Sequence, residues 1–218
     1  MTMIKTFYSY FRSSTAYRLR IALNLKGVTP GETKFVNLLK GEQRGAEYLK
    51  VNPMGAVPAF VLDDGTVLTQ SLAMLEWLDE SYPEPALLPE DPLLKAQARA
   101  FAQIIGCDIH PVNNLRILKY ITGVLHATEG TKKDWIHHWI HQGFAPLEQL
   151  LEGRKTPFCF GAAPGLAEIC LVPQWYNAER FGVDVSRYKQ LGDIVEKCRA
   201  LPSFDNAKPE TQPDWAGG

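Results

Sequence analysis

The sequence is poor in cysteine, and its four cysteines lie too far apart to form a redox or metal-binding motif. They are Cys107, Cys159, Cys170 and Cys198, so no pair has the spacing of a CxxC motif. We expect mostly buried, reduced thiols, as in proteins of a reducing compartment, and no metal site.

The sequence also lacks long apolar runs, a signal-peptide pattern and an excess of one charge. No run approaches the roughly 20 apolar residues that a membrane helix needs. The stretch MTMIKTFYSYF does not have the basic, apolar and small-residue order of a secretory signal. The net charge of −1 gives no field that attracts nucleic acid or an anionic membrane. We therefore expect a cytoplasmic protein without nucleic-acid or membrane partners.

What the sequence does contain is enough apolar material for two small domains. Hydrophobic residues make up 45% and charged residues 22% of the 218 residues, as in ordinary soluble proteins. Prolines crowd the stretch YPEPALLPEDP, where a helix cannot continue. We place a first domain at residues 1–84, a linker at residues 85–92 and a second domain at residues 93–218.

The first domain has the pattern of a small mixed sheet covered by helices. The first helix follows three cap residues and stops at Gly27, and the last helix has Ser71 as a possible cap. The predicted strands are 3–8, 33–38, 56–62 and 66–69, and the predicted helices are 16–27, 43–50 and 71–82. This order of elements predicts an α/β fold.

Beyond Leu93 only helical spacing is convincing. The predicted helices are 93–120, 134–151, 167–181 and 188–200. The tail from Pro202 is short and contains proline, so we expect it to lie on the surface. The second domain is therefore predicted to be all-α.

The run Arg12-Ser13-Ser14-Thr15 joins the first strand to the first helix. A helix start offers N–H groups without helical partners and a partial positive charge. A hydroxyl placed there can donate a hydrogen bond to a thiolate and so lower the pKa of a bound thiol. Ordinary capping is the alternative interpretation.

Two backbone features are candidate ligand contacts. Val57-Pro58 opens a predicted strand, and a cis bond there would turn the Val57 N–H and C=O toward an extended peptide. Gln70-Ser71 begins a helix whose N–H groups can bind a carboxylate. The alternatives are an ordinary strand-start proline and a plain helix cap.

Three arginines are candidates for anion binding. Arg12 lies in the loop beside the hydroxyls, and Arg116 and Arg180 lie on predicted helices of the second domain. A guanidinium group matches a carboxylate with two parallel hydrogen bonds. A solvated or ion-paired arginine is the alternative in each case.

The stretch DWIHHWIHQ contains three histidines, of which His137 and His141 share a helix face. That spacing can bind zinc, but His138 stands where zinc proteases need glutamate, and no third ligand is near. We expect a solvated helix face, with Trp135 and Trp139 used in packing.

Each of these features is weak alone, but their order and spacing match a known family. The matching segments are YSYFRSSTAYRLRIALNLKG, NPMGAVPAF, TQSLAMLEWLDESYP, GCDIHPVNNLRILKY and CLVPQWYNAERF. Together they resemble the zeta class of glutathione transferases, and the resemblance extends over roughly residues 4–213. The elements RSSxxxRxRIAL and HPxxN are specific to this class, whereas NPxxxVPxF and QSxAxxEWL occur in many glutathione transferases.

The resemblance implies a thioredoxin-like N-terminal domain, an all-helical C-terminal domain, a homodimer and glutathione as cofactor. The cysteinyl backbone of glutathione would pair with Val57 ahead of a cis Pro58. Gln70 and Ser71 would hold its γ-glutamyl end, and Gln43 its glycyl end. The residues facing the thiol would be Ser13, Ser14 and Thr15, and those closing the site from the second domain would be His110, Asn113, Asn114 and Arg180.

The implied activity is cis–trans isomerisation of a small dicarboxylate, maleylacetoacetate, by reversible addition of the thiolate to its double bond. One hydroxyl among Ser13, Ser14 and Thr15 would serve the thiol. The candidates to hold the substrate carboxylates would be Arg12, Arg116 and Arg180. The alternatives are a maleylpyruvate isomerase, a conjugating or dehalogenating transferase and, with less support, a non-enzymatic binding protein.

The chain departs from the class in two places. Zeta enzymes usually read SSCSWR and TLAD where this chain reads SSTAYR and GLAE. Thr15 replaces a cysteine but keeps a hydroxyl, which is compatible with isomerisation. Gly165 replaces a threonine cap, which we expect to cost about 1 kcal/mol of stability. Tyr8 and Tyr10 stay alternatives for the thiol, because other classes use a tyrosine near the end of the first strand.

Overall fold

The computed structural model describes residues 3–215 and divides them into two compact units. The first unit holds residues 3–86 together with residues 200–215, and the second holds residues 87–199. Within the described residues, no helix is both long enough and apolar enough to cross a bilayer.

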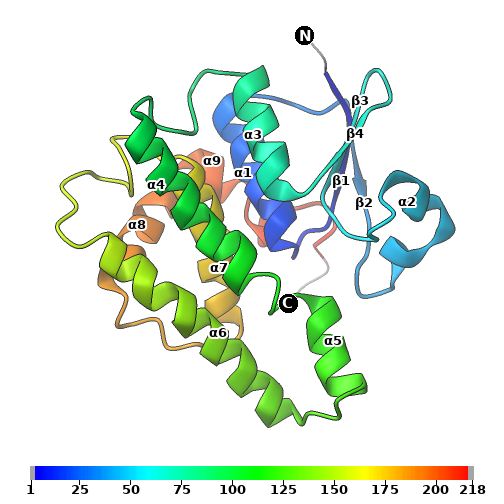
Figure 1. Cartoon of the computed structure of the whole chain (residues 1–218). Coiled ribbons are helices and arrows are strands. Elements are labelled where there is room, and N and C mark those ends of the chain that lie inside the picture. The colour runs from blue at the N-terminus through cyan, green and yellow to red at the C-terminus, as the bar shows by residue number, and fades with distance from the viewer. Residues whose placement is uncertain (1–2, 216–218) are drawn as a thin grey trace. The chain divides into compact units, whose positions relative to one another are not determined.

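The first unit is built on a four-stranded mixed sheet in the order β2-β1-β3-β4. Strand β1 pairs in parallel with β2, and the pairs β1–β3 and β3–β4 are antiparallel. Helices α1 and α3 lie on one side of the sheet and α2 lies on the other (Figure 1). The strands are Ile4–Ser9, Glu32–Phe35, Ala59–Leu62 and Val67–Thr69, and the helices are Ser14–Lys26, Ala46–Val51 and Ser71–Ser81. The predicted order of elements is confirmed.

Helices α1 and α3 run parallel because they are tied together at both ends. Near their starts, Arg18 Nη1 donates to Ser71 Oγ over 3.1 Å. Near their ends, Lys26 Nζ forms an ion pair with Asp79 Oδ1 at 2.6 Å. The N-termini of both helices therefore lie at the same end of the pair, and their partial positive charges add there.

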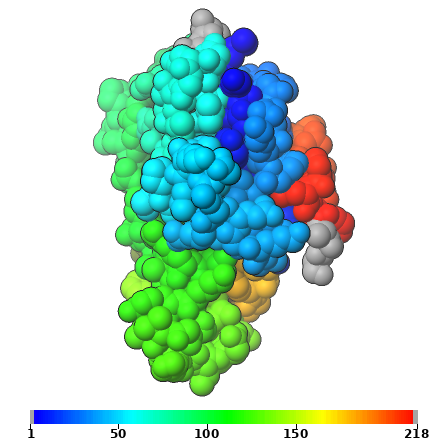
Figure 2. All heavy atoms as spheres, turned by 90° about the vertical axis from the view of Figure 1, so that its right-hand side faces the viewer, coloured from blue at the N-terminus to red at the C-terminus, as the bar shows by residue number. Residues whose placement is uncertain are grey.

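The C-terminal segment packs into the first unit, so the prediction that residues 200–218 belong to a helical second domain is wrong for the described residues 200–215. It contains α9 (Pro202–Asp205) and a 3₁₀ turn, η3 (Pro209–Thr211). Phe204 is 1% and Ala207 0% exposed, so this segment is not a surface tail. In Figure 2 the red C-terminal residues lie against blue residues of the first unit. A short run with three prolines gives no periodic signal from which this packing could be predicted.

The second unit is helical throughout its described secondary structure, as predicted. The helices are α4 (Pro92–Gln103), α5 (Leu115–Gly123), α6 (Glu129–Leu150), α7 (Leu166–Arg180) and α8 (Lys189–Arg199). The predicted single helix over 93–120 is wrong, because a π-helical turn, η2 (Ile104–Ile109), and a break at 110–114 separate α4 from α5. The break ends where the Asn114 side chain accepts the N–H of Arg116 and starts a new helix.

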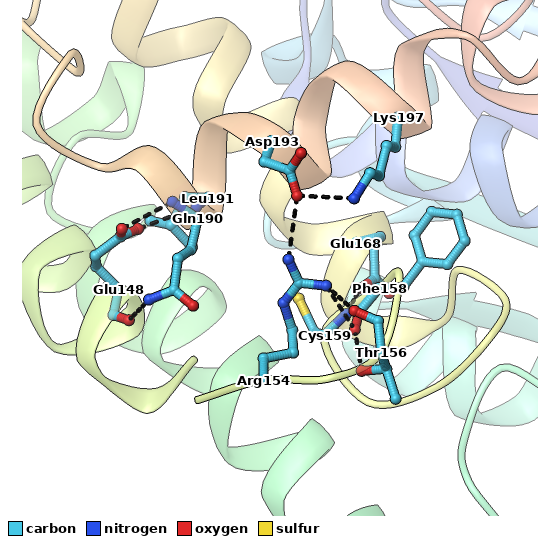
Figure 3. Close-up of polar contacts among 10 residues, drawn as sticks. All are labelled: Glu148, Arg154, Thr156, Phe158, Cys159, Glu168, Gln190, Leu191, Asp193 and Lys197. Carbon is cyan, nitrogen blue, oxygen red and sulfur yellow. Dashed lines mark hydrogen bonds and ion pairs between the residues drawn. The ribbon is translucent and has the colours of Figure 1, made fainter. Parts of the chain in front are cut away.

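The start of α7 is held by a buried carboxylate instead of a threonine cap. Glu168 is 2% exposed and accepts the N–H groups of Cys159 and Gly165 at 2.6 and 2.7 Å. Figure 3 shows the Glu168 carboxylate beside Cys159. A Cβ atom on Gly165 would lie 2.4 Å from the Leu87 carbonyl oxygen, so this close approach requires glycine. The glutamate thus compensates for the missing cap.

The cysteines agree with the expectation of buried thiols at three of four positions. Cys159, Cys170 and Cys198 are buried, whereas Cys107 is exposed, and none of the four forms a disulfide bond. Burial raises the pKa of the Cys159 and Cys198 thiols well above its usual value. These two thiols are therefore inert core residues.

Candidate active site

The loop between β1 and α1 places two hydroxyl groups in one hydrogen-bonded chain. Ser13 is the N-cap of α1, and its Oγ accepts the N–H of Ala16 at 3.2 Å. Thr15 Oγ1 donates to the Val57 carbonyl over 3.0 Å and lies 2.9 Å from Ser13 Oγ. Because each hydroxyl has one proton, Ser13 is the donor to Thr15. The predicted thiol-binding residues Ser13 and Thr15 and the predicted Val57 contact are thus brought together. Ser14 is buried in the first turn of α1.

The loop before Pro58 is fixed by side chains on its own unit. The Val57–Pro58 peptide bond is cis, as predicted. The Ala56 carbonyl accepts hydrogen bonds from Tyr48 Oη at 2.6 Å and from Asn52 Nδ2 at 2.7 Å. Burial raises the pKa of Tyr48 above its usual value, so its hydroxyl keeps the proton that it donates. These bonds fix the residue before Val57, and Thr15 holds the Val57 carbonyl itself.

Gln43 lies next to this loop in a 3₁₀ turn, η1 (Glu42–Arg44). A Cβ atom on Gly55 would lie 2.8 Å from the Gln43 carbonyl, and Gly55 has a φ of +58°. The Gln43 side-chain oxygen is buried and has no hydrogen-bond partner within the described residues. An acceptor in this state suits a ligand that brings a donor.

The start of α3 differs from the predicted cap. Gln70 is the N-cap, with a φ of 68° that a non-glycine residue rarely adopts, and its side chain makes no cap hydrogen bond. Ser71 is the first helical residue, and its hydroxyl accepts from Arg18 instead of capping the helix. The N–H groups of this first turn have no helical acceptor by the geometry of any helix start. Such a position suits an anion.

Arg12 is half-buried in the loop that precedes Ser13. Its guanidinium carbon lies 5.4 Å from the centre of the Phe11 ring. The Phe11 N–H donates to Asp214 Oδ2 over 2.9 Å, and the Phe11 carbonyl accepts from Arg20 Nη2 at 2.9 Å. The C-terminal segment and a buried arginine therefore hold the loop that carries Arg12.

The two tyrosines considered as alternatives are packing residues on β1 and the loop after it. Tyr10 is 4% exposed and belongs to an apolar cluster with Phe11 and Val57. Tyr8 packs edge-on against Tyr48, with their ring centres 5.4 Å apart. The hydroxyl chain that includes Ser13 is the better candidate for a thiol, because it lies at a helix start.

In the second unit, four predicted site residues lie within the segment 110–116. Asn114 Nδ2 lies 3.5 Å from His110 Nε2, and Asn114 Oδ1 accepts the Arg116 N–H at 3.1 Å. The Asn113 side chain has buried nitrogen and oxygen atoms without hydrogen-bond partners in the described part of the chain. Arg116 is exposed. Asn114 is therefore a cap, and Asn113 is the amide that suits a ligand.

Arg180 ends α7 and is exposed, with its guanidinium carbon 4.0 Å from the centre of the Phe181 ring. Helix α6 makes hydrogen bonds to the segment 110–116 and to the residue that follows Arg180. Trp135 Nε1 donates to the Val112 carbonyl over 3.0 Å, and His137 Nε2 donates to the Phe181 carbonyl over 3.0 Å. The expected solvated histidine face is thus wrong for His137, which is half-buried and has a backbone partner.

His141 also has a partner, since its Nδ1 lies 2.8 Å from the Tyr188 hydroxyl. His138 is exposed, in agreement with the solvated face. Trp135 and Trp139 pack on each other with ring centres 5.8 Å apart, as expected. Among residues 3–215, no group of three histidine, cysteine, aspartate or glutamate side chains is placed to hold a metal ion.

Sequence reasoning missed Arg18, which lies behind the start of α3 and bonds to Ser71. A signal for it was present, because Arg18 stands between Tyr17 and Leu19 in a predicted helix that is rich in apolar residues. A cation in such a helix needs a specific partner.

The chain is similar in sequence and fold to known proteins. Residues 12–81 match the family described as glutathione S-transferase, N-terminal domain. The chain is 49% identical to the probable maleylacetoacetate isomerase of Vibrio cholerae, over 95% of this chain and 96% of that protein. The holo structure of a bacterial maleylpyruvate isomerase of the zeta class is 43% identical, with a TM-score of 0.93 over 97% of this chain and 100% of that one. Maleylacetoacetate isomerase from Methylobacterium extorquens AM1, solved with malonate and glutathione, is 36% identical, with a TM-score of 0.93 over 97% and 100%. The chain therefore belongs to the glutathione transferase family and, within it, to the zeta class.

Proposed function

We propose that this chain catalyses the glutathione-dependent cis–trans isomerisation of maleylacetoacetate to fumarylacetoacetate. The observation that carries the proposal is the pairing of two helix starts, of α1 and α3, with Thr15 bonded to the Val57 carbonyl beside the first. This arrangement offers separate places for a thiol, a peptide backbone and a carboxylate. Relatives that match nearly the whole chain are named maleylacetoacetate isomerase, in one case as probable, and maleylpyruvate isomerase.

Glutathione fits the polar groups of the first unit. Its γ-glutamyl carboxylate matches the N–H groups at Gln70 and Ser71, and its cysteinyl backbone matches the Val57 carbonyl. The unpartnered Gln43 oxygen suits a donor near its glycyl end. When bound, glutathione supplies a thiolate that adds reversibly to the substrate double bond, so that the bond can rotate.

Ser13 is the hydroxyl that we assign to the thiol. Its proton points to Thr15 Oγ1, a neutral acceptor, and a thiolate at the start of α1 is a stronger acceptor. The dipole of α1 favours the same charge. Thr15 already donates to the Val57 carbonyl, so its role is to position Val57 and Ser13. Ser14 stays a candidate donor from the first turn of the same helix.

The carboxylates of the substrate need cations, and the chain offers three. Arg12 belongs to the loop before Ser13, and Arg116 and Arg180 belong to the second unit. Each guanidinium can hold one carboxylate with two hydrogen bonds or stabilise negative charge on the conjugated carbonyl. The resemblance to zeta-class glutathione transferases adds three further residues. We propose that His110, Asn113 and Asn114 contact glutathione or the substrate.

Maleylpyruvate is the second candidate substrate, because the holo structure matched here is a maleylpyruvate isomerase. Both acids are cis enedione diacids, and the neighbour solved with malonate supports a dicarboxylate. The resemblance also supports a homodimer in the cytoplasm, with a glutathione-binding domain at 1–84, a linker at 85–92 and a helical domain from 93.

A direct test compares the two acids by spectrophotometry, with and without glutathione. We expect turnover of maleylacetoacetate that requires glutathione but leaves its concentration unchanged, because an isomerase regenerates it. Stoichiometric loss of glutathione would show a conjugating transferase instead. Faster turnover of maleylpyruvate would identify that acid as the substrate instead.

A further inference from the structure

A buried arginine lies behind the helix start that we assign to the γ-glutamyl carboxylate. Arg18 is 1% exposed, and its Nη1 donates to Ser71 Oγ over 3.1 Å. Its Nε and Nη2 are buried and meet no hydrogen-bond acceptor within the described residues. A buried cation without a counter-charge opposes folding, so a ligand that brings negative charge would explain its presence.

The direction of the Arg18–Ser71 bond decides what the serine can do. A guanidinium group only donates, so Ser71 Oγ is the acceptor. The single proton of Ser71 must then point away from Arg18. A hydroxyl that accepts from a cation is also a stronger donor, because hydrogen bonds in a chain polarise one another.

Ser71 is the first residue of α3, which has 11 residues and a start with N–H groups that lack helical partners. Gln70 precedes it with a φ of 68°. A carboxylate at this start would meet the helix N–H groups, the Ser71 proton and the field of the buried guanidinium. All three favour a negative ligand at one place.

We propose that Arg18 is a positioning residue for the γ-glutamyl carboxylate of glutathione. It fixes the Ser71 hydroxyl as a donor toward the ligand, and its charge attracts the carboxylate through the serine. At 1% exposure it does not touch the ligand and acts only through Ser71 and its field. This inference rests on the proposed function in so far as glutathione is the ligand.

The chain offers a matched control on the same helix. Lys26 is also a buried cation of α1, with no exposed side-chain surface, but it forms an ion pair with Asp79 of α3. Its charge is therefore compensated inside the protein. Loss of Lys26 should destabilise the helix pair without changing carboxylate recognition.

The test measures dissociation constants by titration calorimetry for two ligands. One is glutathione, and the other is 4-aminobutyryl-cysteinyl-glycine, which lacks only the γ-glutamyl carboxylate. The variants are Arg18→Met, Arg18→Lys, Ser71→Ala, the double variant Arg18→Met/Ser71→Ala and the control Lys26→Met. Thermal unfolding of each variant confirms that it is folded.

We expect Arg18→Met and Ser71→Ala each to weaken glutathione binding at least tenfold and to change binding of the analogue less than twofold. The double variant should be no weaker than the weaker single variant, and Arg18→Lys should recover part of the affinity. Lys26→Met should keep the wild-type preference for glutathione. With glutathione varied at saturating diacid, Arg18→Met should change KM for glutathione far more than kcat.

Equal losses for both ligands, or a dissociation constant of Arg18→Met within twofold of wild type, would overturn the assignment of Arg18. If Arg18→Met does not fold, Ser71→Ala decides, and unchanged discrimination there overturns it as well. Failure of the wild-type protein to bind glutathione would instead refute the proposed function.

Discussion

The hydroxyl oxygens of Ser13 and Thr15 lie 2.9 Å apart, and Val57 sets the direction of the bond between them. The Thr15 proton is committed to the Val57 carbonyl, so the Ser13 proton is the one that can turn to a ligand. Thr15 takes the place of the cysteine usual in zeta enzymes. In this chain that position therefore links the helix start to the loop before Pro58.

The first prediction concerns Ser13→Ala. This change removes the donor assigned to the thiolate, and a hydrogen bond to a charged group contributes about 1.5–3 kcal/mol. The pKa of the bound thiol should rise by about 1–2 units. The pH profile of kcat/KM should move to higher pH by the same amount. The loss of the N-cap should also cost about 1 kcal/mol of stability, measured by urea unfolding.

Thr15→Val is the matched control, because it removes the hydroxyl that positions Val57 and leaves Ser13 in place. We expect a several-fold higher KM for glutathione and little change in the thiol pKa. A larger pKa change in Thr15→Val than in Ser13→Ala would show that the roles of the two hydroxyls are reversed.

The second prediction concerns Arg180→Ala. If this guanidinium holds a substrate carboxylate, kcat/KM for maleylacetoacetate should fall about 100-fold, as for loss of a bidentate charged hydrogen bond. Activity on a neutral aryl halide should change little. Arg199→Ala is the control, since Arg199 is an arginine ion-paired with Glu179. Equal losses on both substrates would contradict a carboxylate role for Arg180.

The sequence predicted the elements of the first unit well because each has a local signal. Gly27 ends α1 with a φ of 63°, and Ser13 begins it as a cap, as the residue types indicate. The cis Val57–Pro58 bond came from the resemblance to glutathione transferases and is present. The sequence therefore allowed us to predict, in chain order, the hydroxyl residues 13–15, the Val57 backbone contact and the helix start at Ser71.

The features that sequence reasoning missed depend on contacts between distant residues. The bond from Arg18 to Ser71 joins residues 53 positions apart, and that from Arg20 to Ala207 joins residues 187 apart. Neither contact leaves a periodic pattern. For the same reason Ser71 was expected to cap its helix, although its hydroxyl is already occupied by Arg18.

The third prediction concerns the start of α7. Glu168→Gln replaces a carboxylate that accepts two backbone N–H groups with an amide that presents a donor to one of them. We expect a loss of about 3 kcal/mol in the free energy of unfolding.

Gly165→Thr restores the family's cap but places its Cβ against the Leu87 carbonyl, so it should destabilise the protein. A stabilised Gly165→Thr variant would contradict this account. Glu152→Gln is the control for Glu168→Gln, because it removes the same charge at an exposed position and should leave the free energy of unfolding nearly unchanged.

The fourth prediction concerns the pH dependence of stability through His141. Tyr188 accepts a hydrogen bond from Arg187 at 2.7 Å, so its own proton goes to His141 Nδ1. Burial, followed by the charge of Arg187 and then His137, lowers the pKa of His141, and Asp184 opposes this shift. The histidine is therefore held in its neutral form.

Because the folded-state pKa of His141 is below its unfolded value of 6.5, the unfolded chain binds more protons at acidic pH. The contribution of His141 to stability is complete above pH 6.5 and falls as the pH drops below it. Urea unfolding should show a smaller decrease between pH 8 and pH 5, two test values at about equal distances from that pKa, for His141→Gln than for wild type. His138→Gln, at an exposed position, should behave as wild type, and an equal decrease in both variants would exclude His141 as the cause.

The last prediction concerns the C-terminal segment, which the sequence assigned to the wrong unit. Arg20 is buried, and desolvation lowers its pKa to about 10. Its Nε donates to the Ala207 carbonyl over 2.8 Å, and Asp214 accepts the Phe11 N–H.

Ending the chain at Asn206 would leave both donors without these acceptors, so the free energy of unfolding should fall by about 3 kcal/mol or more. Asp214→Asn keeps an acceptor for Phe11 and should cost less than about 1 kcal/mol. Because the Phe11 loop carries Arg12, KM for the diacid should rise in the truncated protein. A truncated protein with wild-type stability would show that this segment does not hold the loop.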